Sequence, residues 1–263
     1  MTALAADPRW RAQARPEGLV VYAGADLTYL IPDLTAEQAG ALAALFDPAT
    51  GGTVDPRTCP ARLRPVLPQL RSLGALRPAE LPAPDRPRAL KVGIRMAGST
   101  SVPLDVALYE AFPPVPEPDL LVLVRTTATL RELTELAGEL ATGRPYLLLD
   151  LAYHHTVSVG PLVVPGGTAC VACLAVRAGR RWGDPPPATR PGAAAEPDFA
   201  VALAAHAVRR IAAGSLALLE RFVDYHLDEL TTTSEHVLPA ADCPVCPGLP
   251  AAPAALPWEG TRR

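Results

Sequence analysis

The stretch GPLVVPGGTACVACLAVRAGRRW, from Gly160 to Trp182, holds two cysteines three positions apart, directly after a Pro-Gly-Gly turn. The chain has 5 cysteines, and a second C-x-x-C pair stands in CPVC near the C-terminus. Two such pairs are the usual ligands of a tetrahedral four-thiolate zinc site. The sequence therefore predicts one structural Zn²⁺ ion, held by Cys170, Cys173, Cys243 and Cys246.

The gap between the two pairs indicates how the metal acts in the fold. Roughly 70 residues separate Cys173 from Cys243, whereas a zinc ribbon has a short gap. We therefore expect the ion to join two distant segments of one larger fold. Two independent pairs or a redox C-x-x-C are the alternatives, but neither pair has a thioredoxin-like context. Four thiolates leave no open coordination position, which argues against a catalytic zinc.

Composition limits the classes of partner. The chain has 263 residues, 49% of them hydrophobic, and a formal net charge of −3, so no basic excess favours nucleic acid or a membrane surface. The N-terminal segment lacks the apolar core of a signal peptide, and runs such as LLVLV at 120–124 are far too short to span a membrane. We expect a cytoplasmic protein with reduced cysteines.

Residues 1–80 read as a small α+β module. Short β-favouring runs predict strands at 18–24 and 27–32, and WRAQARP before them predicts a third. Thr35 and Gln38 form the capping box of a helix over 36–47, and leucines at helical spacing predict a helix pair over 56–76 that ends at Gly74. Strands followed by three helices are typical of a winged-helix-like module. A DNA-binding regulator is one alternative, although the near-neutral charge argues against it.

A proline-rich linker, 81–89, leads to a second domain at 90–250, and a Pro/Ala-rich tail follows at 251–263. Continuous apolar runs alternate with amphipathic ones in this domain, which predicts a parallel α/β sheet. The predicted strands are 89–98, 118–126 and 145–153, and the predicted helices are 105–112 and 128–143. Beyond them we expect a hairpin at 155–166, a loop at 183–197, one or two helices over 198–227 and a β segment at 229–239.

Two segments together carry a family resemblance. The run VGPLVVPGGTACVACLAVR and the segment HLDELTTTSEHVLPAADCPVC resemble the C-terminal half of ThiF/MoeB-type activating enzymes. More closely they resemble the ocin-ThiF-like family, the TOMM cyclodehydratase C-proteins. The N-terminal module fits the RiPP recognition element of that family, which is similar to PqqD. The resemblance covers nearly the whole chain, and it implies an α/β fold with a PqqD-like module before a degenerate ThiF/MoeB-like zinc-binding domain.

The resemblance also implies a function. Such proteins bind the leader of a precursor peptide and act as a scaffold for a YcaO cyclodehydratase, which makes thiazoles and oxazolines on ribosomal peptides. An FMN-dependent azoline dehydrogenase is a further partner that the resemblance implies, and it leaves a homodimer open. Catalysis would belong to the YcaO partner, so this chain would have no catalytic residue of its own.

The departures from an active adenylating enzyme concern the nucleotide site. The turn after the first strand of the second domain reads GIRMAGSTS, with Gly93 and Gly98 but no G-x-G-x-x-G motif. Lys91 is the only lysine, and Cys59 is the only cysteine outside the two pairs. We therefore expect ATP not to bind this chain, although an active ATP-dependent enzyme of the ThiF/MoeB type stays open as an alternative.

The leader is expected to bind the N-terminal module. An edge strand at 27–31 would leave N–H and C=O groups unpaired, so an extended peptide could add beside it. Side-chain pockets between this strand and the last helix would give specificity. The alternative is that the helix leucines only fill the core of a small module. The predicted peptide-binding residues are Leu27, Thr28, Tyr29, Leu30, Ile31, Leu67, Leu70 and Leu73.

Overall fold

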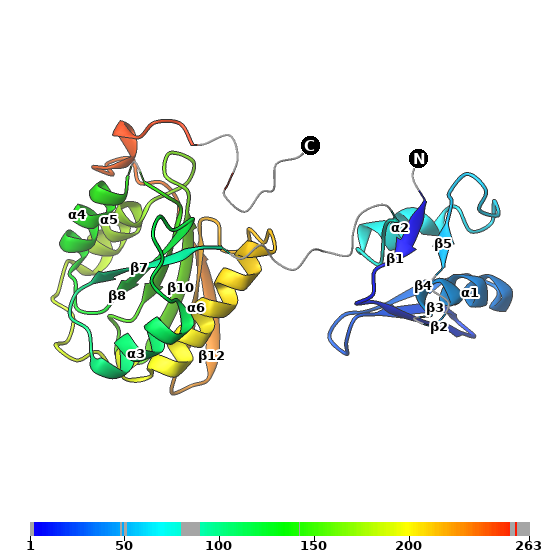
Figure 1. Cartoon of the computed structure of the whole chain (residues 1–263), viewed down its shortest axis with the longest axis horizontal. Helices are drawn as coiled ribbons and strands as arrows, with labels where there is room; N and C mark the ends of the chain where they lie inside the picture. Colours follow the sequence, from blue (N-terminus) through cyan, green and yellow to red (C-terminus); the bar gives the residue numbers. More distant parts are fainter. Residues whose placement is uncertain are drawn as a thin grey trace. The chain divides into compact units, whose positions relative to one another are not determined.

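The computed structural model of the chain contains two compact units, residues 1–85 and 86–263 (Figure 1). It describes residues 3–47, 49, 52–79, 90–141, 143–252 and 256. The predicted linker 81–89 and most of the predicted tail 251–263 lie outside the described residues. Each unit has its own hydrophobic core. No helix in the described part of the chain is long and apolar enough to cross a membrane.

The N-terminal unit contains two small antiparallel sheets. The first has the order β2 (Arg11–Arg15), β3 (Gly18–Tyr22), β4 (Thr28–Pro32), which confirms the three predicted strands. The second was not predicted and has the order β5 (Thr53–Val54), β1 (Leu4–Ala6), β6 (Leu76–Pro78). Its strands are two or three residues long, too short to show the period-2 pattern on which a sequence prediction depends.

The helices of this unit agree with the sequence in part. Helix α1 (Ala36–Ala43) begins with the predicted capping box and continues into the 3₁₀ turn η1 (Ala44–Phe46). The predicted helix pair over 56–76 is wrong, because only α2 (Val66–Ser72) forms. Residues 56–65 are turns, since prolines at 56, 60 and 65 remove backbone donors that a helix needs. Helix α2 ends at Ser72, and Gly74, the predicted end of the pair, follows two residues later with φ +75°.

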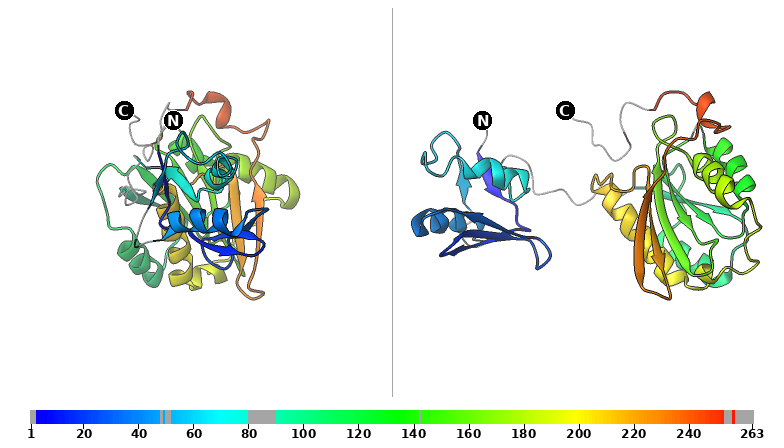
Figure 2. Two further views of the ribbon diagram at one scale, coloured as in Figure 1. Left: turned by 90° about the vertical axis from the view of Figure 1, so that its right-hand side faces the viewer. Right: turned by 180° about the vertical axis from the view of Figure 1, so that it is seen from behind.

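The C-terminal unit is built on a mixed sheet of 6 strands in the order β12-β11-β10-β9-β8-β7 (Figure 2). Parallel pairing joins the first three strands in the chain, β7 (Val92–Ala97), β8 (Leu120–Arg125) and β9 (Tyr146–Asp150). Antiparallel pairing joins β9 to β10 (Thr156–Val163), β11 (Arg221–His226) and β12 (Thr231–His236). The helices are α3 (Val102–Ala111), α4 (Leu130–Leu140), α5 (Val171–Trp182) and α6 (Pro197–Ala212), with 3₁₀ turns η2 (Gly192–Ala195) and η3 (Cys246–Gly248).

The helices form a layer on each face of this sheet (Figure 1). Helices α3 and α6 share one apolar core with Val122 and Leu147 of the sheet. Helices α4 and α5 share the other core with Leu123 and Leu148. The strands β7, β8 and β9 follow one another in one direction, yet α3 and α4 connect them on opposite faces. A point where adjacent connections leave for opposite faces is the usual place for a ligand crevice, at the carboxyl ends of the strands.

Two predictions for this unit are wrong. The predicted hairpin at 155–166 is one strand, β10, which pairs with both neighbours and has an irregular register near Gly160. A side chain at Gly160 would collide with the carbonyl of Arg221, so only glycine fits there. The predicted helical region over 198–227 ends at Ala212, and its last part is strand β11.

Candidate functional site

The four paired cysteines meet at one point of the C-terminal unit. Their sulfur atoms all lie within 4.8 Å of one another. The Sγ–Sγ distances are 3.7 Å for Cys170–Cys243, 3.4 Å for Cys173–Cys246 and 3.5 Å for Cys170–Cys246. Four thiolates at about 2.3 Å from a Zn²⁺ ion would be roughly 3.8 Å apart. The donor set and its spacing therefore fit a zinc ion, and all four cysteines are free of disulfides.

Two different local structures hold the pairs. Cys170 is the N-cap residue of α5, and Cys173 lies in its first turn. Cys243 and Cys246 lie in the turn that leads into η3, where the Cys246 N–H points at the Cys243 sulfur at 3.5 Å. Helix N-termini and N–H donors both stabilise thiolate charge, which acts against the effect of burial on these sulfurs.

Polar contacts next to the cysteines hold the same two segments together. The Arg177 guanidinium of α5 donates to the carbonyls of Leu238 and Pro239 at 3.0 and 3.2 Å. One turn later, Arg180 forms an ion pair with Asp242 at 2.5 Å. A metal here would join the start of α5 to residues 237–248, two segments that are distant in the sequence.

Proton affinity differs among the sulfurs. Burial is the largest cause that raises the pKa of Cys170, and it raises the pKa of Cys246 to about 11. Burial also acts on Cys243, but N–H donors from Cys246 and Val245 outweigh it and lower the Cys243 pKa. Metal binding at neutral pH would therefore have to displace protons from the buried thiols.

The crevice at the carboxyl ends of β7 and β8 is filled by the chain itself. Gly98 follows β7, and a Cβ atom there would lie 2.5 Å from the Thr127 nitrogen, so the loop after β8 packs directly on the turn. The Ser99 N–H donates to the Thr127 hydroxyl at 2.7 Å, and the Thr126 hydroxyl donates to the Ser99 carbonyl. A backbone donor that could face a phosphate is thus already paired within the chain.

The N-terminus of α3, which begins beside this crevice, is also unsuited to an anion. Pro103 removes one of the N–H groups of the first turn. Asp105 places a carboxylate in the same turn, where its oxygen accepts from the Thr100 hydroxyl at 2.7 Å. A phosphate here would meet negative charge instead of free donors.

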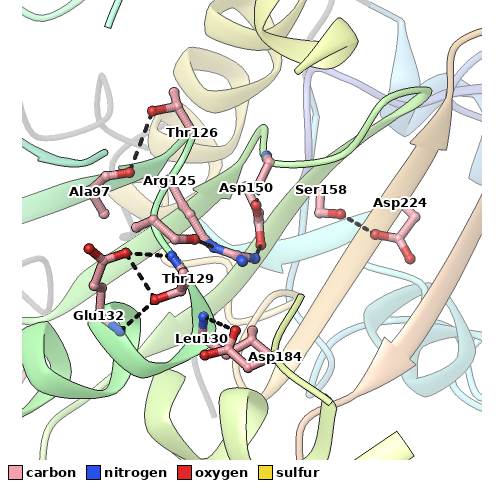
Figure 3. Close-up of polar contacts among 12 residues, drawn as sticks. Ala97, Arg125, Thr126, Thr129, Leu130, Glu132, Asp150, Ser158, Asp184 and Asp224 are labelled. Atoms are coloured by element: carbon pink, nitrogen blue, oxygen red, sulfur yellow. Dashed lines mark hydrogen bonds and ion pairs between the residues drawn. The ribbon is translucent and has the colours of Figure 1, made fainter. Parts of the chain in front are cut away.

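A carboxylate also occupies the N-terminus of α4 (Figure 3). The Asp184 oxygens accept from the N–H groups of Leu130 and Arg131 at 2.7 and 3.0 Å. Thr129 and Glu132 complete a capping box at the same end. The donors of the first turn are therefore satisfied by side chains of this chain.

A buried polar row crosses the sheet next to the crevice (Figure 3). Arg125 donates to Asp150 at 2.9 Å, and both side chains are at most 5% exposed. Ser158 of β10 pairs in register with Asp150 and donates to Asp224 of β11. Sequence analysis missed this row, although a charged residue at the end of an apolar strand, as at Arg125 and Asp150, is a signal that could have pointed to it. The row links the four strands β8, β9, β10 and β11. Removing one partner of a buried ion pair such as Arg125–Asp150 lowers the free energy of unfolding by about 3–5 kcal/mol.

The predicted peptide-binding residues divide into two groups. Strand β4 lies at the edge of its sheet, with Leu27 37%, Tyr29 40% and Leu30 51% exposed. Thr28 is exposed as well, whereas Ile31 belongs to the core.

The helix leucines are mostly core residues. Leu67 is 3% exposed and Leu70 is fully buried, among the same side chains that pack on Leu19 and Val21. Leu73 is half-buried at the end of α2. A peptide on the surface could therefore reach Leu73 but not Leu67 or Leu70 without rearrangement of the module. For these two residues, the observed burial agrees with the alternative that they fill the core.

No protein-family model matches the chain, and no curated protein matches it. Among solved structures it is similar to the heterocyclase TruD, with 17% identity and a TM-score of 0.59 over 94% of this chain and 43% of TruD. It is similar to a heterocyclase solved with substrate and cofactor, with 18% identity and a TM-score of 0.57 over 94% of this chain and 40% of the other. It is also similar to E. coli MccB solved with MccA-N7isoASN, with 13% identity and a TM-score of 0.60 over 93% of this chain and 99% of MccB.

The chain thus spans about two-fifths of the length of the two heterocyclases and nearly the whole of MccB. At identities this low, the likeness concerns the fold. The chain has a mixed α/β fold with small N-terminal antiparallel sheets and a ThiF/MccB-like mixed sheet. Its four-cysteine cluster is consistent with a zinc site.

Proposed function

We propose that this chain is the leader-peptide-binding, non-catalytic scaffold subunit of a YcaO-dependent cyclodehydratase that forms azolines on a ribosomal precursor peptide. The observation that carries the proposal is the edge of β4, which pairs with β3 alone in the described part of the chain and is an exposed apolar strand on a small unit with its own core. The likeness of the whole chain to heterocyclases and to MccB supports the class of reaction.

The backbone of β4 offers regularly spaced bonding groups. The Ala23 N–H donates to the Leu27 carbonyl, so residues 27, 29 and 31 direct their backbone groups toward β3. The groups of Thr28 and Leu30 then point away from β3, toward the open edge. An extended leader would pair with these two residues by strand addition.

The side chains of β4 indicate what kind of leader would fit. Tyr29 lies on the core side of the sheet, where it stacks on Trp10 with ring centroids 6.1 Å apart. Leu30 lies on the opposite face and is half exposed. A strand added beside β4 would meet an apolar side chain on each face, so apolar residues two apart in the leader would pack on Tyr29 and their neighbours would pack near Leu30.

The closed crevice of the C-terminal unit supports the non-catalytic part of the proposal. Its turn is paired to Thr127, and the adjacent helix begins with Pro103 and Asp105. Adenylation needs donors and positive charge at the nucleotide phosphates, which these residues do not offer. The competing candidate is an adenylating enzyme, favoured by the likeness to MccB, which has been solved with ATP. ATP–pyrophosphate exchange by the isolated chain would identify that candidate.

The experiment that tests leader binding uses proline at the strand edge. Leu30→Pro removes one outward N–H without touching the ladder to β3, because proline is tolerated where the N–H faces solvent. We expect fluorescence polarisation with the labelled leader of a Cys/Ser/Thr-rich precursor peptide to show at least a tenfold loss of affinity. Leu30→Ala keeps the N–H, so it should lose less affinity for the leader than Leu30→Pro does.

Circular dichroism would check that both variants stay folded. Unchanged affinity in a folded Leu30→Pro variant would show that the leader does not add to β4. The matched control is Leu230→Asp, which changes an 88% exposed leucine of the other unit and should leave the affinity unchanged.

A further inference from the structure

Among the described residues, β7 pairs with β8 alone and forms one edge of the large sheet, at the far end from β12. The Lys91 carbonyl accepts from the N–H groups of Asp119 and Leu120, and the Ala97 carbonyl accepts from Thr126. The odd-numbered residues of β7 therefore face β8. In a parallel ladder the backbone groups of Val92, Ile94 and Met96 must then point away from the sheet. Such a row is a template for an added strand.

An apolar groove runs along the same edge. A cavity of about 390 Å³ is lined by residues of β7, of α3 and of the segment after α3, among them Ile94, Met96, Tyr109, Phe112, Val115 and Pro118. A second cavity of about 340 Å³ adjoins it and shares Val92, Phe112 and Val115. Side chains of an added strand would therefore have apolar volume to fill.

The outer surface of α3 extends the groove. Val102, Val106 and Tyr109 are 76%, 51% and 63% exposed, and their spacing puts them on one face of the helix. An open strand edge, a groove and an apolar helix stripe side by side form a larger apolar surface than the scattered exposed residues of an ordinary monomer. We call this surface the β7–α3 face.

The charges in the groove indicate the occupant. Among the described residues, Asp105 is the one charged residue that lines the larger cavity, and Arg209 lines the smaller one. A two-fold contact between copies centred on the larger cavity would place two Asp105 carboxylates together, with no base in that lining. A different protein that carries a basic residue on an apolar segment would complement the groove.

The comparison structures indicate what kind of protein would dock on the β7–α3 face. The chain spans 40% and 43% of the two heterocyclase chains, so more than half of each has no counterpart here. If this chain works with a separate catalytic subunit, that subunit has to be held by a non-covalent surface. Resting on the proposed function, we propose that the β7–α3 face docks an extended apolar segment of the catalytic YcaO-type subunit, with a basic side chain of that segment at Asp105.

Two variants of the full chain test this, with a purified YcaO-type cyclodehydratase as the probe. Val106→Asp puts a charge into the stripe, and Asp105→Lys reverses the charge of the groove. We expect each to raise the Kd of the complex at least tenfold in a sedimentation or interferometry titration. The matched controls are Leu230→Asp and Glu110→Lys, both exposed and outside the larger cavity, and they should bind like the wild type.

Leader binding is measured on the same samples, so failure of this inference is distinguishable from failure of the proposed function. Loss of the complex with leader affinity intact supports docking on the β7–α3 face. Full binding by both folded variants overturns it, as does the absence of any complex with the wild type. A wild-type dimer that Val106→Asp turns into a monomer would also overturn it, because the face would then belong to a second copy.

Discussion

At the scale of single residues, the C-terminal unit keeps charged groups inside the sheet and satisfies them there. Arg125 and Asp150 neutralise each other, and the Arg125 Nε donates to the Ala128 carbonyl at 2.8 Å. Among the described residues, Asp224 accepts from the Ser158 hydroxyl and from no other side chain. Burial is the largest cause that raises the Asp224 pKa above 3.8, and the nearby Glu235 and Asp150 add to it.

This raised pKa predicts a pH dependence of stability. Below the unfolded pKa of about 3.9, Asp224 is protonated in both states and costs nothing. As the pH rises toward the folded pKa, the unfolded state loses its proton first, so the wild type loses stability. Asp224→Asn keeps the acceptor for Ser158 and removes the charge, so it should gain stability relative to the wild type as the pH rises from about 4.

Urea unfolding of both proteins at pH 3.5, 5 and 7 would measure this difference. The free energies of unfolding of the wild type and of Asp224→Asn should differ least at pH 3.5, so that pH serves as the internal control. A difference that stays constant across the three pH values would contradict the raised pKa of Asp224.

The polar row also shows why residue-scale chemistry was only partly predictable. The clustering of the four cysteines could be predicted because thiolate pairs at this spacing have few other uses. The row at Arg125, Asp150, Ser158 and Asp224 depends on the register of four strands, and Ser158 and Asp224 are 66 residues apart in the chain. No local pattern in the sequence encodes that register.

At the scale of elements, signals that act within one turn predicted the structure reliably. Patterns that fit two structures equally well did not. The capping box of α1 was predictable because Thr35 and Gln38 act within one turn. Strand β11 was taken as helix because the Ala/Leu-rich run of α6 continues past Gly214, where the helix has already ended. The helical spacing of Leu67 and Leu70 fits a core face and a groove face equally well, and only the packing of β3 and β4 decides between them.

The cysteine cluster joins two elements, so its removal should act on both of them. Cys243→Ser should lower the metal content below one zinc per chain and make α5 and residues 237–248 exchange their amide protons faster. The parallel strands β7 to β9 should lose less protection, since their other face packs on α3 and α6, in a core without the cysteines. Inductively coupled plasma mass spectrometry and hydrogen exchange would measure the two effects.

Cys59→Ser is the matched control, because Cys59 is buried at 4% exposure in the other unit and takes no part in the cluster. It should leave the zinc content unchanged. Wild-type protection in the metal-free Cys243→Ser protein would mean that Arg177 and the Arg180–Asp242 pair hold the segments together without a metal.

At the scale of the whole molecule, the chain divides the proposed tasks between two units. The unit of residues 1–85 carries the open edge of β4, and the unit of residues 86–263 carries the cysteine cluster and the β7–α3 face. The division into a small α+β module and a larger α/β domain could be expected from the sequence, because the hydrophobic pattern changes on either side of a proline-rich stretch.

This division predicts that the units work separately. Residues 1–85 pack around Leu19, Leu42 and Leu70, all at most 1% exposed, and need no side chain of the other core. Expressed alone, this unit should unfold cooperatively in urea, with the low stability of a small domain, and bind the labelled leader within about threefold of the full chain. Residues 86–263 alone should retain zinc and not bind the leader. If the small unit folds but binds the leader more than tenfold more weakly than the full chain, the leader must also contact the second unit, because the edge of β4 is complete in the first.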